Sequence, residues 1–345
     1  MTIDSTKNIA PDNLTFQTPP DSIMQLADYE RAPSVSIDTK KEYMLLSYHS
    51  TYKSLEDLNQ KEMSMGGLRI NPITNIGSSV NYINNLKIRK VVETEPIQVN
   101  GLSANPRIAF VTWSPDETKI AFTNTVGNGV ELWVLDVATA TATCLTQPVV
   151  NANLGNPLNW YRNSRELLVR LLPKVRPALI DPSKKLPNGP TVSVSNGSVS
   201  QNRTYPDLLK NASDEINFVT LTSSELYKID LNGTTELFKD TDMYAGESFS
   251  ADGKFVLVTT LRKPFTYIVP LNRFPQLSVV YDLEGNEVKT VNEVPLSEVL
   301  PKGFMSVRKG KRGLSWRPDQ PATLYFVEAL DGGDPEQKVE YRDAL

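Results

Sequence analysis

The sequence has very few of the two side chains that most often build metal and redox sites. Its 345 residues include one cysteine, Cys144, and one histidine, His49. A lone cysteine cannot close a disulfide within the chain, and these two side chains cannot supply the four ligands of a structural zinc or iron–sulfur site. We therefore expect no metal site and no cofactor.

An excess of positive charge and a long apolar run are also missing. The chain has 36 lysines and arginines against 40 aspartates and glutamates, which gives a formal net charge of −4. Most nucleic-acid binding depends on neutralising phosphates with basic side chains, so we expect no nucleic-acid partner. The longest apolar stretches, such as 254–261, have the length of a strand and contain polar residues. No membrane span is expected from them.

The chain opens with a polar segment punctuated by proline, and we expect residues 1–20 to form a tail. This segment has neither the basic start nor the apolar centre of a secretion signal. The sequence therefore leaves the compartment open. A periplasmic or secreted parent protein would need a start upstream of Met1.

The motifs of serine hydrolases and nucleotide-binding proteins are absent as well. A nucleophile elbow needs G-x-S-x-G, and the nearest matches, around Ser103, Ser248 and Ser315, lack the final glycine. His49 is the one side chain that could shuttle a proton in a serine triad, and a structural place in a strand suits it better. Walker and Rossmann glycine patterns do not occur. We expect no catalytic residue here and no activity from the chain alone.

What the sequence does contain is a repeat of an apolar pair, a turn and an alternating apolar strand. The clearest copy is 111–124, VTWSPDETKIAFTN, and weaker copies lie at 33–47, 158–170, 247–259 and 314–327. The copies align on Val35, Trp113, Trp160, Phe249 and Trp316. Each copy predicts a β-hairpin, because Pro and Asp or Gly favour a tight turn between two strands.

The repeat predicts an all-β protein with the fold of a β-propeller. Further strand pairs at 130–147 and 224–240 follow two of the hairpins, and four antiparallel strands make one blade of the TolB or WD type. The interval from Trp113 to Trp160 matches the roughly 40–50 residues of one blade. We expect an incomplete propeller over 21–345, with short helical inserts at 53–63 and 205–212 and a long insertion at about 171–214.

Two other features allow more than one interpretation. The tryptophans at 113, 133, 160 and 316 could form a stacking platform for a sugar or a base, but their place in the repeat favours the packed interior of the blades. The basic run 308–312 could attract an acidic ligand, although a solvated loop is the commoner fate of such a run.

Several segments together resemble the N-terminal half of glutamyl endopeptidase-like enzymes in the prolyl oligopeptidase family of serine peptidases. They are 33–58, the GGLRINPITN segment at 66–75, the blade at 111–140 and the NRTYPDLLKNASDE segment at 202–215. The repeat is shared with TolB-like and other propellers, whereas the LRINP and RTYPDLLKN segments are far more specific. The sequence departs from the pattern after Asn75, where the chain reads Ile76-Gly77-Ser78-Ser79 and a further arginine is expected.

The resemblance implies a role without catalysis for this chain. In such enzymes a propeller precedes an α/β-hydrolase domain that carries the catalytic serine, and we expect that domain to be absent from this chain. The propeller would gate the access of peptides to it, so the expected partners are a peptide substrate and the hydrolase domain of the full-length protein. Acidic substrates need a cation, and the resemblance makes Arg69 the first candidate for substrate binding and Arg203 the second.

A different class of function stays open beside this one. A stand-alone TolB-like propeller would act as a protein-binding scaffold, with the loops of one face holding a partner. A scaffold should close on a whole number of blades, whereas the repeats of this chain end raggedly. This difference favours the peptidase interpretation.

Overall fold

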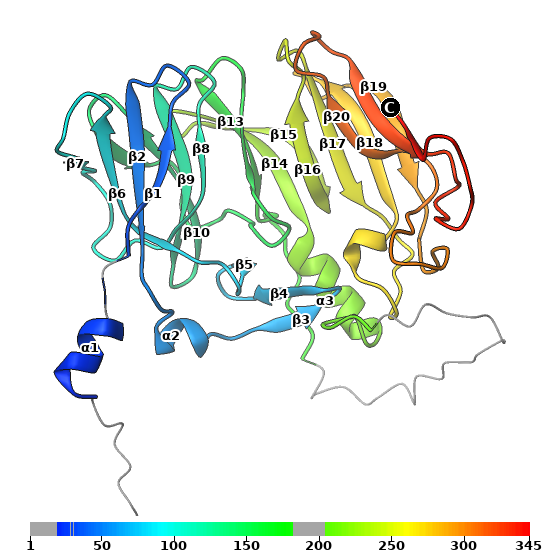
Figure 1. The fold of residues 1–345 in the computed structure, drawn as a ribbon, viewed down its shortest axis with the longest axis horizontal. Coiled ribbons are helices and arrows are strands. Elements are labelled where there is room, and N and C mark those ends of the chain that lie inside the picture. Colours follow the sequence, from blue (N-terminus) through cyan, green and yellow to red (C-terminus); the bar gives the residue numbers. More distant parts are fainter. Residues whose placement is uncertain (1–18, 28, 30, 182–203) are drawn as a thin grey trace, which may run out of the picture.

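The computed structural model describes residues 19–27, 29, 31–181 and 204–345. Its elements follow one another as consecutive antiparallel sheets, which lie side by side in chain order (Figure 1). Most of the expected tail at 1–20 and much of the insertion at 171–214 lie outside the described residues. A short helix, α1 (Asp21–Ala27), precedes the sheets and has no buried residue.

The sheets are propeller blades, as the repeat predicted. The first blade consists of β1 (Ser34–Ile37), β2 (Tyr43–His49), β6 (Ile83–Lys90) and β7 (Ile97–Gln98). The second consists of β8 (Ile108–Trp113), β9 (Lys119–Val126), β10 (Gly129–Asp136) and β11 (Thr141–Cys144). A single residue pair, Ile83 with Ile108, joins these two blades into one continuous sheet.

The later blades repeat the same order of strands. The third has β12 (Leu158–Trp160), β13 (Glu166–Leu171), β14 (Ser224–Asp230) and β15 (Thr235–Asp242). The fourth has β16 (Tyr244–Phe249), β17 (Phe255–Leu261), β18 (Gln276–Asp282) and β19 (Glu287–Val294). The fifth has three strands, β20 (Arg312–Trp316), β21 (Leu324–Ala329) and β22 (Asp343–Ala344). All five predicted hairpins are confirmed as the first two strands of a blade.

The side chains of the S-x-D turn hold the hairpin together. In the second blade the Ser114 hydroxyl accepts from the backbone N–H of Lys119 at 3.0 Å and donates to Asp116 Oδ1 at 2.6 Å. Glu117 completes the turn with a φ of 61°, a conformation in which glycine is commoner. The fourth blade builds the same turn from Ser250 and Asp252. The turn therefore does not depend on the proline, which is missing from that copy.

These turns gather at one end of the propeller, here called the turn end, and link each blade to the next. Asp116 donates its backbone N–H to the hydroxyl of Ser164 at 3.0 Å, and Asp252 donates its own to the carbonyl of Pro321 at 2.9 Å. Thr39 in the first blade binds the Glu117 carboxylate through its backbone N–H at 2.9 Å. The turn motif thus serves two purposes, because it closes a hairpin and joins neighbouring blades.

Tryptophans at the repeat position also connect neighbouring blades. Each donates its indole N–H to the first strand of the preceding blade. The donor–acceptor pairs are Trp113 with Ser36 Oγ (2.9 Å), Trp160 with Thr112 O (3.2 Å) and Trp316 with Ser248 O (3.0 Å). Trp160 is buried, whereas Trp113 and Trp316 are half-buried. All three therefore lie at interfaces between blades, and the prediction of packed tryptophans holds fully only for Trp160 among them.

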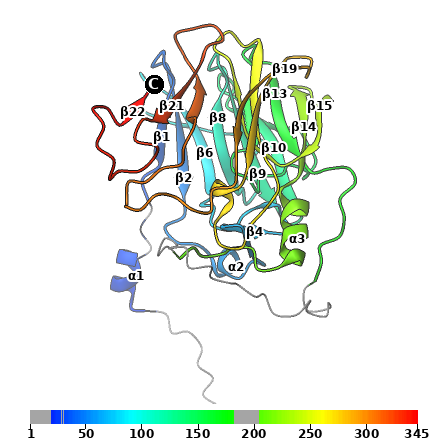
Figure 2. The same cartoon turned by 90° about the vertical axis from the view of Figure 1, so that its right-hand side faces the viewer.

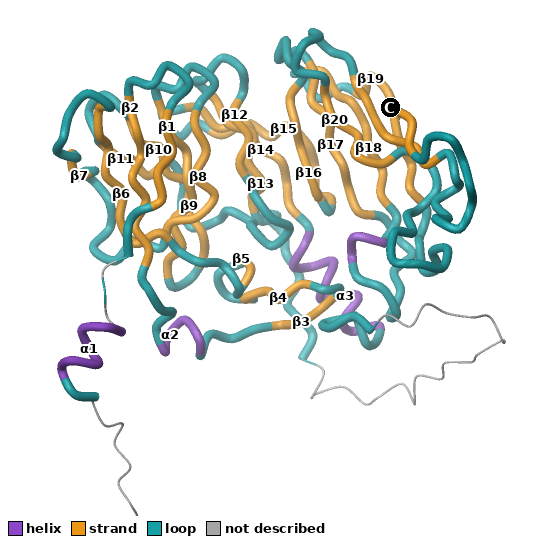
Figure 3. The backbone as a smooth tube through the Cα atoms, viewed as in Figure 1, coloured by secondary structure: helices purple, strands orange, loops and turns teal. Residues whose placement is uncertain are grey.

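Three long inserts lie at the opposite end, here called the insert end. They follow β2, β13 and β17, the second strand of their blades, because a second strand that starts at the turn end finishes at the other. The inserts contain α2 (Leu55–Leu58), the small sheet of β3 (Met63–Met65), β4 (Leu68–Asn71) and β5 (Ile76–Gly77), α3 (Ala212–Thr222) and the 3₁₀ turn η2 (Leu271–Arg273). Figures 1 and 2 both show α2, β4 and α3 at this end, and Figure 3 shows that most of the described helix is here.

The inserts share a hydrophobic core, here called the insert core. Phe218 is fully buried at its centre, with its ring edge-on to Phe265 at 5.2 Å and to Phe274 at 5.8 Å. Around these rings lie Met65, Ile70, Leu209, Leu221, Met243, Leu261 and Val269. At Gly66 a β-carbon would lie 2.9 Å from the Phe218 ring, so a glycine is needed for this approach. The insert core joins segments from three different blades.

The helix predictions were partly wrong. The predicted helix at 53–63 shrinks to the four residues of α2, since Met63 already belongs to a strand. Residues 205–211 are not helical. The helix there, α3, begins at Ala212, after Asn211 caps it by accepting the N–H of Asp214 at 3.0 Å. Threonine, valine and isoleucine in α3 lower its helix propensity, and its burial against the insert core stabilises it instead.

Candidate functional site

The two segments that carry the specific resemblance meet at the insert end. Arg69, on β4, donates from Nε to Asp207 Oδ2 at 2.7 Å, and the backbone N–H of Gly67 donates to the Asp207 carbonyl at 2.8 Å. Glu62 lies 3.9 Å from the same guanidinium nitrogen. The two segments are 138 positions apart at this contact. The LRINP and RTYPDLLKN segments thus form one structural unit.

Arg69 is exposed but already paired. Its side chain is 54% exposed, and the hydrogen bond with Asp207 raises the pKa of the guanidinium and lowers the pKa of the carboxyl. The charge of Arg69 is therefore already offset in part by Asp207. The second predicted residue, Arg203, lies outside the described residues.

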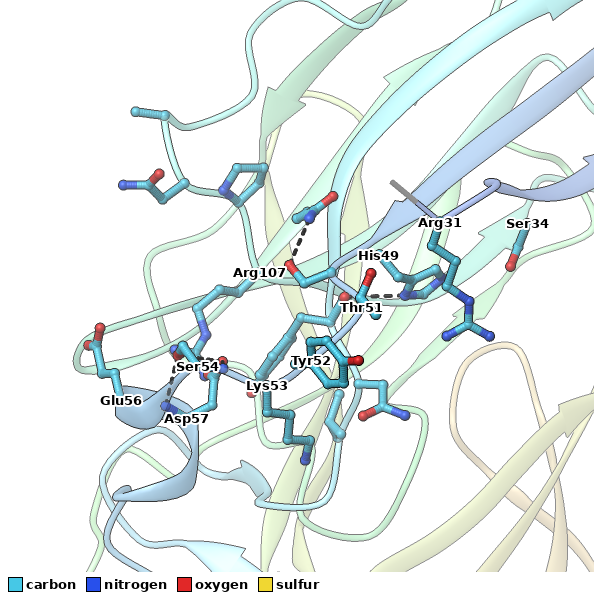
Figure 4. A pocket seen from close by; sticks show the side chains of 18 residues that line it. Arg31, Ser34, His49, Thr51, Tyr52, Lys53, Ser54, Glu56, Asp57 and Arg107 are labelled. Atoms are coloured by element: carbon cyan, nitrogen blue, oxygen red, sulfur yellow. Dashed lines mark hydrogen bonds and ion pairs between the residues drawn. The ribbon is translucent and has the colours of Figure 1, made fainter. Parts of the chain in front are cut away.

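Beside this unit the first blade forms a polar cavity at the insert end, with a volume of about 810 Å³ (Figure 4). Four segments line it: the approach to β1, the end of β2 with the chain that follows, the stretch before β6 and the loop before β8. The charged residues and tyrosines of the lining are Arg31, His49, Tyr52, Lys53, Glu56, Asp57, Tyr82 and Arg107. We call this cavity the blade-1 pocket.

One wall of the pocket is fixed by Arg107. Its guanidinium donates to Asp57, with 2.7 Å between Nη2 and Oδ1, and lies over the Tyr82 ring at 4.4 Å from the centroid. Burial alone would raise the pKa of Asp57, but the Ser54 hydroxyl and the charges of Arg107 and Lys53 outweigh it, and this pKa is lowered. Asp57 is therefore ionised at neutral pH and offsets the charge of Arg107.

Two other cations of the pocket have no such partner. Within the described parts of the chain, no carboxylate lies within ion-pair distance of Arg31 or Lys53, and the ammonium of Lys53 contacts the carbonyl of Ser78 at 3.4 Å. Figure 4 shows Tyr52 and Lys53 between Arg107 on one side and Arg31 on the other. The open part of the pocket is therefore cationic, with Glu56 as its one carboxylate besides Asp57.

The pocket contains hydroxyls and the single histidine, but they do not form a nucleophilic pair. His49 Nδ1 lies 3.2 Å from the Tyr82 carbonyl, the Thr51 hydroxyl donates to the Tyr29 carbonyl, and the Ser50 hydroxyl accepts from Asn84. A nucleophile needs a base within hydrogen-bond reach, and the contacts of these groups show none. The part of the chain that the structure describes also holds no group of three potential metal ligands. This geometry supports binding of a ligand.

Sequence reasoning missed the blade-1 pocket. Its lining comes from segments spread between residues 31 and 107, and no short motif connects them. The one available signal was Lys53, which lies both in the segment 33–58 that carries the resemblance and in the predicted helical insert at 53–63. The sequence predicted Arg69 as the leading cation, and the structure adds Arg31 and Lys53, which have fewer partners among the described residues.

Comparison with known proteins gives a consistent result along the chain. No family model matches the sequence. A protein of Oryza sativa subsp. japonica named "Probable glutamyl endopeptidase, chloroplastic" is 32% identical over 96% of the chain, and one of Arabidopsis thaliana with the same name is 33% identical over 96%. The chain is a homologue of proteins named glutamyl endopeptidase. It spans only 36% and 35% of the length of these two glutamyl endopeptidases.

Solved structures with a similar arrangement include peptidase propellers. The acylaminoacyl peptidase of Pyrococcus horikoshii matches 78% of the chain and 33% of its own length, with 13% identity and a TM-score of 0.41. The β-propeller domain of the Trilobed protease from Pyrococcus furiosus matches 76% and 59%, with 14% identity and a TM-score of 0.38. Both scores are below 0.5, and the assignment of the propeller fold depends on the strand order within the blades. Among the described residues, no helix combines the length and apolarity needed to cross a bilayer.

Proposed function

We propose that this chain is the propeller portion of a glutamyl endopeptidase-like serine peptidase of the prolyl oligopeptidase family. Residues 21–345 would form the propeller, and an α/β-hydrolase domain elsewhere in the full-length protein would supply the catalytic serine. The observation that carries this proposal is the 32–33% identity over 96% of the chain to proteins named glutamyl endopeptidase. The propeller would limit which peptides reach the hydrolase domain.

The geometry supports a gate that works by exclusion and binding. The blades are joined at the turn end by backbone and side-chain hydrogen bonds, so they give a rigid frame. The insert end carries the specific segments and exposes Arg69. An extended peptide could approach this end, while a folded protein would meet the inserts first. Arg69 would then hold an acidic side chain beside Asp207 or in its place, because a guanidinium forms charge-assisted and often bidentate hydrogen bonds with carboxylates.

The decisive experiment reads the gene beyond the 345 codons and assays the whole protein. We expect a segment with G-x-S-x-G followed by aspartate and histidine, and cleavage of peptides after glutamate that phenylmethylsulfonyl fluoride abolishes. The 345-residue chain alone should cleave no peptide or ester, since its sequence has no nucleophile elbow and the contacts of its described residues pair no serine, threonine or cysteine with His49. A whole gene without a hydrolase segment would refute the proposal and favour the TolB-like scaffold.

The role of Arg69 can be tested in the same whole protein. Arg69→Gln should raise KM for glutamyl substrates by about fivefold and spare kcat, as expected when an exposed charge contact that acts equally on ground and transition state is lost. Arg165→Gln is the control, because Arg165 is exposed on a turn of the third blade. Unchanged kinetics with a lowered melting temperature would assign Arg69 to structure only.

A further inference from the structure

We propose that the blade-1 pocket binds an acidic segment of the peptide substrate, through Arg31 and Lys53, away from the bond to be cut. This inference rests on the proposed function, and it assigns to the propeller a second cationic contact besides Arg69. It makes Arg31 and Lys53 specificity-determining residues, with Arg107 as a positioning residue.

The first step of the argument is the balance of charge in the pocket. Arg107 and Asp57 pair at 2.7 Å and offset each other. Arg31 and Lys53 have no carboxylate at ion-pair distance within the described ranges, and Glu56 is the single remaining acid of the lining. A cavity whose uncompensated charges are mainly positive attracts a ligand with carboxylates. This stands out in a chain whose net charge is −4.

The second step is the rigidity of the pocket wall. The Arg107 guanidinium is held by the Asp57 carboxylate and by the Tyr82 ring beneath it. Ser54 binds Asp57 through its hydroxyl at 2.8 Å and thereby fixes the chain next to Lys53. Lys53 and Tyr52 therefore project from a constrained segment, although their own side chains are exposed. Because the wall is already constrained, less conformational entropy is lost when a peptide binds.

The third step is size. A volume of about 810 Å³ is within the range of small-ligand pockets, roughly 300–1,000 Å³. One glutamate side chain would leave most of it empty, whereas a short stretch of extended peptide would fill it. The hydroxyl of Tyr52 and the amide of Asn81 stand at the same lining and could bind peptide backbone. The pocket therefore fits several residues with acidic side chains and not a single one.

The fourth step is the difference from Arg69. That arginine has two carboxylate neighbours, Asp207 at 2.7 Å and Glu62 at 3.9 Å. These carboxylates already offset the charge of Arg69, whereas among the described residues no carboxylate lies at ion-pair distance from Arg31 or Lys53. We therefore expect the blade-1 pocket to bind acidic peptide more tightly than the surroundings of Arg69 do.

The experiment measures the binding of a fluorescein-labelled octapeptide of alternating Glu and Gly to the 345-residue chain by anisotropy. The comparison peptide has Gln in place of Glu. The double variant Arg31→Gln/Lys53→Gln should weaken binding of the Glu peptide by about tenfold. The control, Arg165→Gln/Lys254→Gln, removes the same two charges from exposed turns of the third and fourth blades and should leave the affinity unchanged. Added salt should weaken the binding by the parent chain.

A charge-reversal variant guards against misfolding as an explanation. Arg31→Glu/Lys53→Glu should lose the Glu peptide and gain binding of a Lys–Gly octapeptide, which an unfolded protein would not do selectively. Equal affinity for the Glu and Gln peptides, or full affinity in the first double variant, would overturn the inference. Cleavage of glutamyl peptides by the whole protein would then still uphold the proposed function. Conversely, charge-dependent binding in a protein whose gene lacks a hydrolase segment would refute only the proposed function.

Discussion

The turn end of the propeller repeats one kind of contact, whereas the insert end has a core that occurs once. At the turn end, each S-x-D turn binds the turn of the next blade, as Asp116 binds Ser164 and Asp252 binds Pro321. At the insert end, three unrelated inserts pack on Phe218. Repeated contacts between neighbours add up nearly independently, while a shared core is lost as a whole. The turn end therefore acts as a frame, whereas the insert end carries the LRINP and RTYPDLLKN segments.

The largest effect is expected when the insert core is broken. Phe218→Ala removes a fully buried ring and should lower the free energy of unfolding by about 3–5 kcal/mol. Urea denaturation measures this loss, and hydrogen exchange shows where it falls. We expect amides of α3 and β4 to lose protection while β9 and β10 keep theirs. Equal loss of protection in the blades would mean that the two ends are one cooperative unit.

A smaller effect is expected at the interfaces between blades. Trp160→Ala should cost about 3 kcal/mol, since this side chain is only 7% exposed and its indole N–H bonds to Thr112. Trp113→Ala should cost less, because Trp113 is half-buried and donates to an exposed serine hydroxyl. Thermal and urea melts of the two variants side by side measure the order. The reverse order would contradict the blade interfaces as described.

A single contact of the turn end should have a modest effect. Ser164→Ala removes the hydroxyl that accepts the backbone N–H of Asp116, and a lost hydrogen bond of this kind costs about 1 kcal/mol. The neighbouring exposed position offers a matched control in Arg165→Ala, which should change stability little. Urea midpoints of both variants decide the matter. A loss as large as that of Phe218→Ala would show that the turns are not independent contacts.

The smallest effect concerns the ionisation of the turn aspartate. Burial would raise the pKa of Asp116, but hydrogen bonds from Ser114 and Thr118 outweigh it and lower this pKa below its ordinary value of 3.8. A carboxyl whose pKa is lower in the folded protein than in the unfolded chain stabilises the folded protein at a pH above its pKa in the unfolded chain. This stabilisation is lost as the pH falls through its pKa in the folded protein. The loss of stability caused by Asp116→Asn should therefore be greatest above about pH 5. Urea melts should show the two proteins converging on acidification, and parallel curves would exclude the effect.

The repeated parts of the fold could be predicted from the sequence because their signals are local. Ser114 and Asp116 stand two positions apart, and the turn they form is complete within a few residues. The same holds for the five hairpins. The alternation of apolar residues in β9 was a weaker guide, since six of its eight residues are buried on both faces between neighbouring blades.

The inserted parts could not be predicted in the same way. Helix α3 depends on packing against Phe265 and Phe274, which follow it in the chain, and its own residues favour helix weakly. The resemblance singled out Arg69, but nothing in the sequence indicated that Asp207 would pair with it across 138 positions. The blade-1 pocket is likewise a product of tertiary structure. Local rules describe the frame, and only the folded chain reveals the site.

The insert core has a consequence for synthesis on the ribosome. Each blade draws its strands mainly from one stretch of chain, so it can pair them soon after that stretch emerges. The insert core contains both Met65 and Phe274, so the ribosome adds its last aromatic residue long after its first residue. During that interval the LRINP segment and α3 are exposed without their partners. A ribosome that pauses before residue 274 should therefore hold a nascent chain with formed blades and an apolar end, to which a chaperone that recognises exposed apolar segments would bind.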